Sequence, residues 1–432
     1  MRVSKYRLYP ILGSFFALTL VSQPVGAAGF QMVLQNASSL GTAYSGTAAI
    51  AEDASTNYYN TAGLIRLPDE QIAFGGVMNI LDTKLNVTSA SANTGALLTP
   101  STGTTKPSNS GPLPFFHYAK RIDENWIFGF SSAVPFGSKA DYKIDSIARY
   151  TTTRAEMETI DLSPSLAYNF NNGFSLGGGV DALNMLAKIG NSITIGASNV
   201  NTDGFTESTY SNWALGYHVG GLYEVNTCTR FGVQYHSKFD VKTRGESLTQ
   251  LAAGLPTASQ GLKATFNLPD TTIFSVYHAF NDEWAAMADV QWTHWSRFQK
   301  IVTRFDNGTQ VIVNENYKNV YRAAAGGSYQ YSDSWRFRFG VMFDQSPVPD
   351  VNRNIFIPNQ DRILPAVGAQ YRISKTLALD FGYAHMFFKK DNNLNVVAPT
   401  SVGLTQGAQN LKGSMRNRLD AIGLQLTWDI KP

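Results

Sequence analysis

The chain has 432 residues, with 35 Lys and Arg against 32 Asp and Glu and a formal charge of +3. Residues 1–27 combine a start with three basic residues, an apolar run and a small-residue cleavage site, which predicts a secretory signal peptide. Its removal changes the charge to 3 − 3 = 0, so nothing indicates nucleic-acid binding. A single cysteine, Cys228, excludes an internal disulfide framework, and the absence of a later run of ~20 apolar residues excludes a helical membrane protein.

Residues 28–67 differ in composition from everything that follows. Gly, Ala, Ser, Thr and Asn dominate, and the only charges between Ala28 and Ile65 are Glu52 and Asp53. Such a segment can neither bury a core of its own nor behave as a charged disordered tail. We therefore expect a plug, or hatch, held inside a container that residues 68–432 provide.

In the rest of the chain, apolar and polar residues alternate with a period of two. From Trp335 to Phe343 the odd positions are large and apolar, while the even positions are polar, small or flexible. Residues 377–387 and 422–430 repeat this pattern. It predicts strands with one apolar face, either in a transmembrane barrel, where that face meets lipid, or in a secreted β-rich soluble protein, where it points inward.

Turn spacing favours the barrel. Tight polar turns alternate with long polar segments, as periplasmic turns alternate with extracellular loops in outer-membrane barrels. Six short turns and seven long segments predict an all-β fold, a 14-stranded antiparallel transmembrane β-barrel with both chain ends on the periplasmic side. The turns are at 123–125, 171–173, 226–227, 281–283, 332–334 and 374–375, and the long segments are at 88–112, 138–153, 188–210, 244–262, 306–315, 345–362 and 389–413.

No catalytic or metal-binding motif is recognisable. Six histidines are scattered without HExxH spacing, and CxxC, GxSxG and phosphate-loop patterns are missing. We expect no enzyme activity, no cofactor and no metal site. A membrane lipase with Ser and His on neighbouring strands, or a structural or adhesin barrel, is the alternative from another class.

Two local patterns suggest sites in the barrel. In the 244–262 segment, Leu248, Leu251 and Leu255 have helical spacing, which predicts a short amphipathic helix that either packs on its own loop or offers an apolar substrate a landing surface. In the third strand a proline cannot donate to the β-ladder and a nearby glycine permits a kink. The stretch either forms a lateral opening in the wall or ends the strand at the outer rim; its residues are Val134, Pro135, Phe136 and Gly137.

A series of motifs resembles the FadL-type long-chain fatty acid transporters of the Gram-negative outer membrane, a family that also includes aromatic-hydrocarbon channels. The resemblance implies a 14-stranded barrel with an N-terminal hatch, and passive uptake of a long-chain fatty acid that leaves sideways into outer-membrane lipid through a kink in strand three. It also implies that Lys318 faces the ligand carboxylate, and we expect a monomer. The motifs are AGFQ at 28–31, LGTAYSGTAAIAEDAS at 40–55, WTHWSRFQ at 292–299, YKNVYRAAAG at 317–326 and FDQSPVPDVNR at 343–353.

The hatch supplies the remaining candidate residues. Gly29 and Phe30 end the mature plug, and Phe30 is either part of the ligand pocket and moves with ligand, or a simple anchor. Where the family has Asn-Pro-Ala, this chain has Asn60, Thr61 and Ala62, so we expect a looser gate turn without the fixed φ of proline. The 188–210 segment is short and polar, which leaves an outer binding groove only partly supported.

A first prediction concerns Lys318, whose alternative role is that of a solvated lysine at a strand end. A cation beside a buried carboxylate offsets the cost of burying that charge. We expect Lys318→Ala to weaken fatty acid binding far more than binding of an uncharged alcohol of equal length, measured by equilibrium titration in detergent. Equal losses for the two ligands would remove Lys318 from the site.

Overall fold

The computed structural model describes residues 29–92, 98–194, 199–356, 359–396, 401–402 and 409–431. The predicted signal peptide lies outside these ranges. The fold is all-β, and 14 antiparallel strands close into a barrel. Pairing of the first strand with the last closes the ring, from Ile72 against Trp428 to Leu85 against Met415. The expected fold class and strand number are confirmed.

Several barrel strands consist of two segments in line, notably β4 with β5, β9 with β10, β11 with β12, β13 with β14 and β15 with β16. The barrel segments are β1 Glu70–Ala92, β3 Gly111–Arg121, β4 Trp126–Ala133, β5 Gly137–Asp141, β6 Arg154–Asn169, β7 Phe174–Ile193, β8 Asp203–Glu224, β9 Thr229–His236, β10 Phe239–Ala252, β11 Ala258–Leu268, β12 Thr271–Ala279, β13 Trp284–Thr293, β14 Lys300–Phe305, β15 Gln310–Asn314, β16 Val320–Gln330, β17 Trp335–Asp344, β18 Arg362–Arg372, β19 Leu377–Phe388 and β22 Gln409–Lys431. Short additional strands are β2 Gly103–Thr105, β20 Asp391–Val396 and β21 Ser401–Val402.

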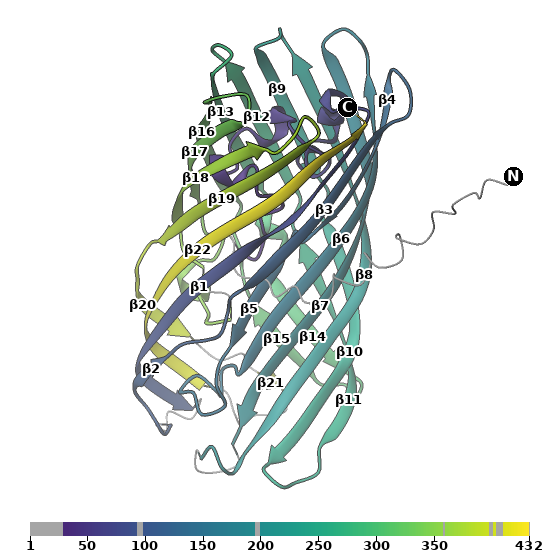
Figure 1. Cartoon of the computed structure of the whole chain (residues 1–432). Coiled ribbons are helices and arrows are strands. Elements are labelled where there is room, and N and C mark those ends of the chain that lie inside the picture. The colour runs from purple at the N-terminus through teal and green to yellow at the C-terminus, as the bar shows by residue number, and fades with distance from the viewer. Residues whose placement is uncertain are drawn as a thin grey trace, which may run out of the picture.

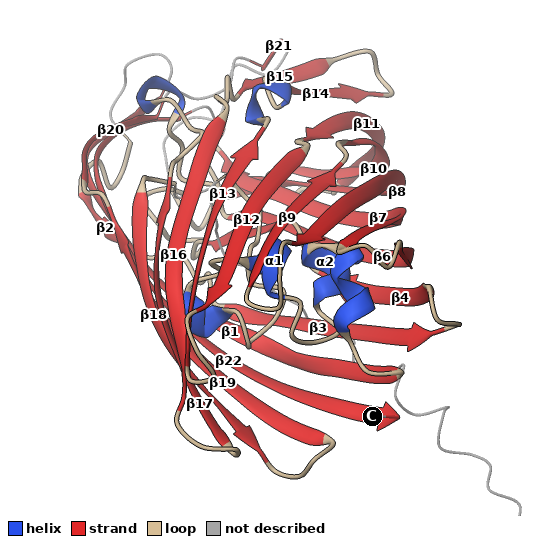
Figure 2. Ribbon diagram, turned by 90° about the horizontal axis from the view of Figure 1, so that it is seen from above, coloured by secondary structure: helices blue, strands red, loops and turns tan. Residues whose placement is uncertain are grey.

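Residues 29–67, called the N-terminal segment below, lie within the ring of strands (Figure 2). Their short helices touch the inner wall on several sides: α1 lies against β9 and β12, η2 against β17 and β18, and η3 against β6 and β7. Within the described ranges, no helix has the length and apolar character needed to cross a membrane. The helices are η2 Leu40–Thr42, α1 Thr47–Ile50, α2 Thr56–Tyr59 and η3 Thr61–Arg66 here, with η4 Trp295–Arg297 and η5 Asp350–Asn352 between strands.

The six tight turns are found where the sequence predicts them. A side-chain oxygen at the start of the turn accepts a hydrogen bond from the first backbone N–H of the next strand, which fixes the turn locally. The N–H of Trp126 donates to Asp123 Oδ1 at 2.8 Å and that of Trp284 to Asn281 Oδ1 at 2.7 Å. These turns place the aromatic residues Trp126, Trp284 and Trp335 half-exposed at the end of the barrel.

The alternation in the strands places apolar residues outside. On β17, Phe337, Phe339 and Val341 are 42%, 46% and 48% exposed, whereas Arg338 between them is 3% exposed and points into the lumen. An apolar exterior around a lumen that contains arginine is the reverse of a soluble sandwich and is typical of a barrel in lipid. The secreted soluble alternative is therefore excluded by the direction of the side chains.

The long polar segments were expected to be loops, but two of them consist mostly of strand. Most of 188–210 and 244–262 consists of strand, since β7 and β8 run into the first and β10 and β11 into the second. The amphipathic helix expected at Leu248 and Leu251 is wrong, because Leu248 pairs with Ser259 across a β-ladder. Beyond the membrane both faces of a strand meet water, so polar residues on both faces hide the alternation while the backbone pairing continues.

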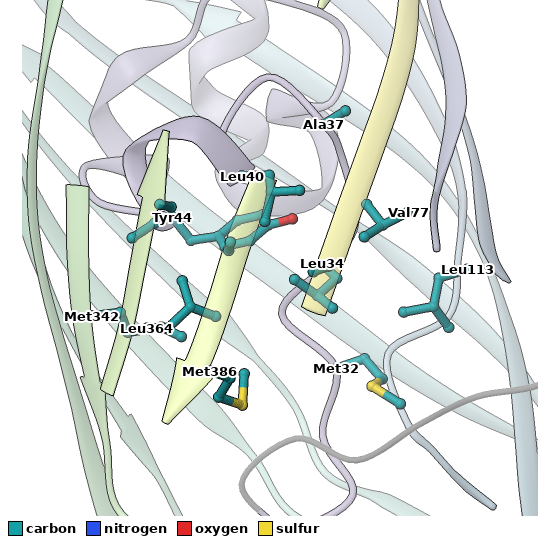
Figure 3. Packing of buried hydrophobic residues seen from close by; sticks show 14 of the residues in the cluster. Met32, Leu34, Ala37, Leu40, Tyr44, Val77, Leu113, Met342, Leu364 and Met386 are labelled. Carbon is teal, nitrogen blue, oxygen red and sulfur yellow. The ribbon is translucent and has the colours of Figure 1, made fainter. Parts of the chain in front are cut away.

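Apolar contacts hold the N-terminal segment to the wall. Leu34, Leu40 and Tyr44 from the segment share one buried cluster with residues from β1, β3, β17, β18 and β19 (Figure 3). All three are at most 4% exposed. The wall residues labelled in the figure are Val77, Leu113, Met342, Leu364 and Met386.

Wall glycines allow the segment to approach the strands closely. A Cβ added at Gly340 would lie 2.1 Å from the carbonyl oxygen of Thr42, and one at Gly177 would lie 2.6 Å from the backbone N of Ala62. Such distances are shorter than any van der Waals contact. The lumen wall at Gly177 and Gly340 therefore makes direct backbone contact with the N-terminal segment.

We expect Gly340→Ala to displace the segment, because its methyl group would overlap the rigid Thr42 backbone. The measurement is limited proteolysis of the purified barrel, in which the variant should lose the N-terminal segment at least several-fold faster. Gly221→Ala is the matched control, since its added Cβ would meet nothing closer than 3.6 Å. Equal protection of both variants would contradict close packing at Gly340.

Candidate functional site

Phe30 lies at the centre of a buried aromatic nest. Its ring centroid is 4.7 Å from that of Trp295 and 5.0 Å from that of Phe298, both in edge-to-face geometry. Phe136, from the break in strand three, is 6.1 Å away, and Tyr317 completes the nest. The predicted residue thus sits where an apolar side chain occupies space inside the lumen.

The nest contains two polar atoms without a partner. Trp295 Nε1 and Tyr317 Oη are buried and make no hydrogen bond to any described residue. An unsatisfied buried donor costs about 1–3 kcal/mol, so such atoms in a native structure require an explanation. A ligand or water that accepts hydrogen bonds at this position would satisfy both.

Gly29 cannot be replaced without disturbing the nest. Its φ is +65°, and a Cβ would lie 2.5 Å from the Trp295 ring. Its carbonyl accepts a 2.9 Å hydrogen bond from Asn359 Nδ2. Chain conformation and close packing both require glycine here.

Strand three is interrupted where the sequence analysis placed the lateral opening. β4 ends at Ala133 and β5 begins at Gly137. Both pair with β6 on one side, but only β4 pairs with β3 on the other, from Phe116 to Arg121. The wall between β3 and β5 therefore has no ladder.

Residues 30–35 of the N-terminal segment supply the missing hydrogen bonds. The Gln35 side chain accepts from Val134 N at 2.9 Å and donates to Val134 O at 2.6 Å. The N–H of Met32 donates to Pro135 O at 2.8 Å, and Gly137 N donates to Phe30 O at 2.7 Å. This short strip, called the closing strip below, makes four hydrogen bonds to the break, while the N–H and C=O of Phe136 bond to Thr159 Oγ1 of β6.

The nest is part of a larger buried apolar cluster. Its other members come from β7, β8, β10, β11 and β16. Apolar side chains of this kind suit contact with an apolar ligand. Wall residues of the cluster are Leu183, Met185, Tyr210, Val241, Leu262, Phe266 and Val320.

The turn at Asn60, Thr61 and Ala62 is held by several hydrogen bonds, which differs from the expected looser turn. The Asn60 side chain accepts from Ala62 N at 3.1 Å, and its amide donates to Ala48 O at 2.6 Å and to Gly221 O at 3.0 Å. Asn60, Thr61 and Ala62 are all fully buried. Hydrogen bonds from one asparagine replace the conformational restriction that proline would give.

A charged clamp ties the middle of the segment to the wall. Glu52 accepts 2.9 Å hydrogen bonds from Arg336 and Arg338, and Arg338 also donates to Asp380 at 2.6 Å. Arg230 donates at 2.6 Å to the carbonyls of Ala49 and Ile50 at the end of α1. Sequence reasoning missed this clamp, although the inward positions of the two arginines on β17 follow from its alternation.

The remaining candidates lie apart from the nest. Lys318 directly follows the nest residue Tyr317, but its side chain is exposed and its backbone N–H donates to Pro347 O at 2.9 Å. Leu251 and Leu255 are each 47% exposed at the tip of the β10–β11 hairpin. The roles of these residues in ligand capture stay predictions.

The lipase alternative has a geometric counterpart. Ser165 Oγ lies 3.0 Å from His218 Nε2, and His218 Nδ1 lies 2.6 Å from Asp181 Oδ1. All three are at most 4% exposed on neighbouring strands beneath the N-terminal segment. A Cβ at Gly179 would lie 2.7 Å from both Ser165 and His218, so an acyl group has no room to reach the hydroxyl. This chain of hydrogen bonds is best explained as packing.

A closed barrel with an apolar exterior, an interior segment and a large buried apolar cluster inside it defines an outer-membrane transport barrel. The family of outer membrane transport proteins known as OMPP1/FadL/TodX matches residues 18–429, and the chain belongs to this family. The protein is therefore located in the outer membrane of a Gram-negative cell.

Similar proteins and solved structures agree with this family assignment. The long-chain fatty acid transport protein of Escherichia coli K12 is 29% identical over 413 residues, covering 86% of this chain and 90% of that protein. Outer membrane protein P1 of Haemophilus influenzae is 28% identical over 411 residues, covering 87% and 89%. A Pseudomonas aeruginosa FadL homologue superposes with a TM-score of 0.84 at 24% identity over 93% of this chain and 100% of that one. The Pseudomonas putida toluene transporter TodX gives 0.66 at 15% identity over 94% and 99%.

The contacts of Glu52 predict that the stability of the N-terminal segment depends on pH. Burial favours the neutral acid of Glu52, but Arg336 and Arg338 outweigh it and lower the pKa to about 2 from the ordinary 4.5. Because the pKa of Glu52 is lower in the folded than in the unfolded protein, its ionised carboxylate stabilises the folded state above about pH 4.5. This stabilisation is lost as the pH falls from about 4.5 to 2. We expect Glu52→Gln to loosen the segment at pH 7, seen by proteolysis, and to abolish this acid-dependent part. The same acid response in the variant as in wild type would contradict the clamp.

Proposed function

We propose that the protein is a passive, ligand-gated channel for hydrophobic molecules, above all long-chain fatty acids. Ligand enters the apolar interior around the Phe30 nest from outside, the N-terminal segment is the plug that closes the lumen, and release occurs sideways through the break in strand three. The fatty acid assignment is supported by relatives of about 29% identity that carry this name.

The observation that carries this proposal is the closing strip. In lipid each unpaired backbone group costs several kcal/mol, so a break in a barrel wall requires partners for its N–H and C=O groups. The strip provides the partners of Val134, Pro135 and Gly137 and also contains Phe30 of the nest. A ligand that displaces Phe30 therefore acts on the same residues that close the wall.

Aromatic hydrocarbons are the second candidate ligand. The Phe30 nest favours them, because its edge-to-face rings at 4.7 and 5.0 Å would suit another aromatic ring. The nest also suits the end of an acyl chain. Direct competition between toluene and oleate in the purified protein separates these ligands.

A reversible lock tests the gate. Gln31 and Phe136 are partners in an antiparallel bridge, a geometry in which the Cα separation fits a disulfide. We expect Gln31→Cys with Phe136→Cys, in a Cys228→Ser background, to stop cellular uptake of labelled oleate when oxidised. Reduction should restore uptake, because only the strip is tied.

Each single cysteine variant is the control for loss of the native side chain. Both should transport equally with and without reductant. Unchanged uptake by the oxidised double variant, with the disulfide verified by mass spectrometry, would overturn release through this break.

A further inference from the structure

Arg322 is a buried cation without a proper partner. It points inward from β16 and is 3% exposed, and its Nε and Nη2 make no hydrogen bond to any described residue. The nearest carboxylate oxygen, Asp289 Oδ2, lies 3.7 Å from Nη2, which is too far for a hydrogen bond. Arginine remains charged in proteins, so this charge is permanently present in the lumen.

Two other arginines in the lumen each have a hydrogen-bonded carboxylate partner. Arg338 donates at 2.6 Å to Asp380, and Arg362 donates at 3.0 Å from Nε to Asp344. Asp289 accepts a hydrogen bond from Thr47 of the N-terminal segment instead of from Arg322. Arg322 thus has two buried N–H donors, in the geometry that binds a carboxylate.

These donors border a cavity that reaches the break in the wall. Its lining joins Arg322 and Gln291 on one side with Pro135 and Phe136 on the other, and Met32 of the closing strip lies between them. The cavity measures about 40 Å³, which holds a few waters and no acyl chain. Space for a ligand therefore requires the closing strip to move.

The strip is fastened beside the arginine. Gln31 donates to Thr271 Oγ1 at 3.0 Å and accepts from Thr293 Oγ1 at 3.2 Å and from Gln291 Nε2 at 3.3 Å. Gln291 is the neighbour of Arg322 across the β13–β16 ladder. Displacement of the strip that closes the break consequently also uncovers Arg322.

The charge of Arg322 gives the cavity a direction. Asp161 lines it next to the break, where it pairs across the ladder with Ala133, the last residue of β4. His236 also lines the cavity, and its Nε2 contacts Tyr58 O at 2.9 Å. A carboxylate is attracted by Arg322, whereas the apolar side chains of Pro135 and Phe136 at the break suit an acyl tail.

We propose that Arg322 binds the carboxylate head of the transported acid after the strip has moved, with the acyl tail directed to the break. Release is then tail first. This inference rests on the proposed function and adds a specificity-determining residue to it. It separates carboxylic acids from neutral hydrocarbons of the same length.

The test compares oleate with oleyl alcohol in the purified full-length protein. We expect Arg322→Met to weaken oleate binding at least tenfold and to change alcohol binding less than twofold, because only the acid uses the charge. Equal losses for both ligands, or no loss, would overturn the proposal. If the wild type binds neither ligand, the proposed function itself fails, which is a separate result.

Asp289→Asn is a matched variant that should change oleate binding in the opposite direction. It removes the carboxylate nearest to Arg322 and should tighten oleate binding several-fold while leaving the alcohol unchanged; unchanged or weaker oleate binding counts against the proposal. If Arg322→Met does not fold, Arg322→Met with Asp289→Asn leaves no unpaired buried charge and repeats the comparison.

A separate experiment measures the orientation of the bound fatty acid. Palmitate with a diazirine at the methyl end should label residues 134–137, and palmitate with the diazirine near the carboxyl group should label β13 or β16. The reverse labelling would overturn tail-first release.

Discussion

The structure depends on the hydrogen-bonding demand of a backbone that is interrupted inside a membrane. A closed barrel satisfies every N–H and C=O in its ladders, and a gap between β3 and β5 removes that satisfaction over a few residues. The closing strip restores it with Gln35, Met32 and Phe30. The break and the strip are therefore one device, because neither is stable in lipid without the other.

The N-terminal segment is held by contacts of several kinds. Buried apolar residues such as Leu40 pack against the wall, glycines such as Gly340 let backbones meet, and Glu52 binds two arginines. The middle is fastened by Glu52 and the turn at Asn60 by the bonds of that side chain. The strip at its start is held by its bonds to the break and by those of Gln31.

The barrel could be predicted from the sequence because the signals that define its strands and turns are local. Alternation on β17 and turn residues such as Asp123 act within a few positions, and they predicted the strand number and the inside–outside arrangement. Extensions of the strands were missed because polar residues on both faces carry no period. The helix expected at Leu248 failed for the same reason, since three leucines also fit a strand and its turn.

The site could be predicted only in part. Pro135 and Phe30 were found from chain chemistry, but the bonds between them join residues about a hundred positions apart, such as Gln35 and Val134. The nest around Trp295 and the missing hydrogen bonds of Arg322 Nε and Nη2 among the described residues depend on which strands face each other across the lumen. An inward arginine can be predicted from alternation, whereas its contacts need the three-dimensional arrangement.

The four hydrogen bonds between the strip and the break also set how tightly the wall is sealed when no ligand is bound. At about 1 kcal/mol net for each bond, these four bonds alone contribute about 4 kcal/mol to keeping the wall closed, and the three hydrogen bonds of Gln31 add to this. In the proposed function, a ligand that binds inside offsets this cost with its own affinity, whereas an amphiphile that cannot use the nest does not. The same bonds would then keep the outer membrane closed to such amphiphiles.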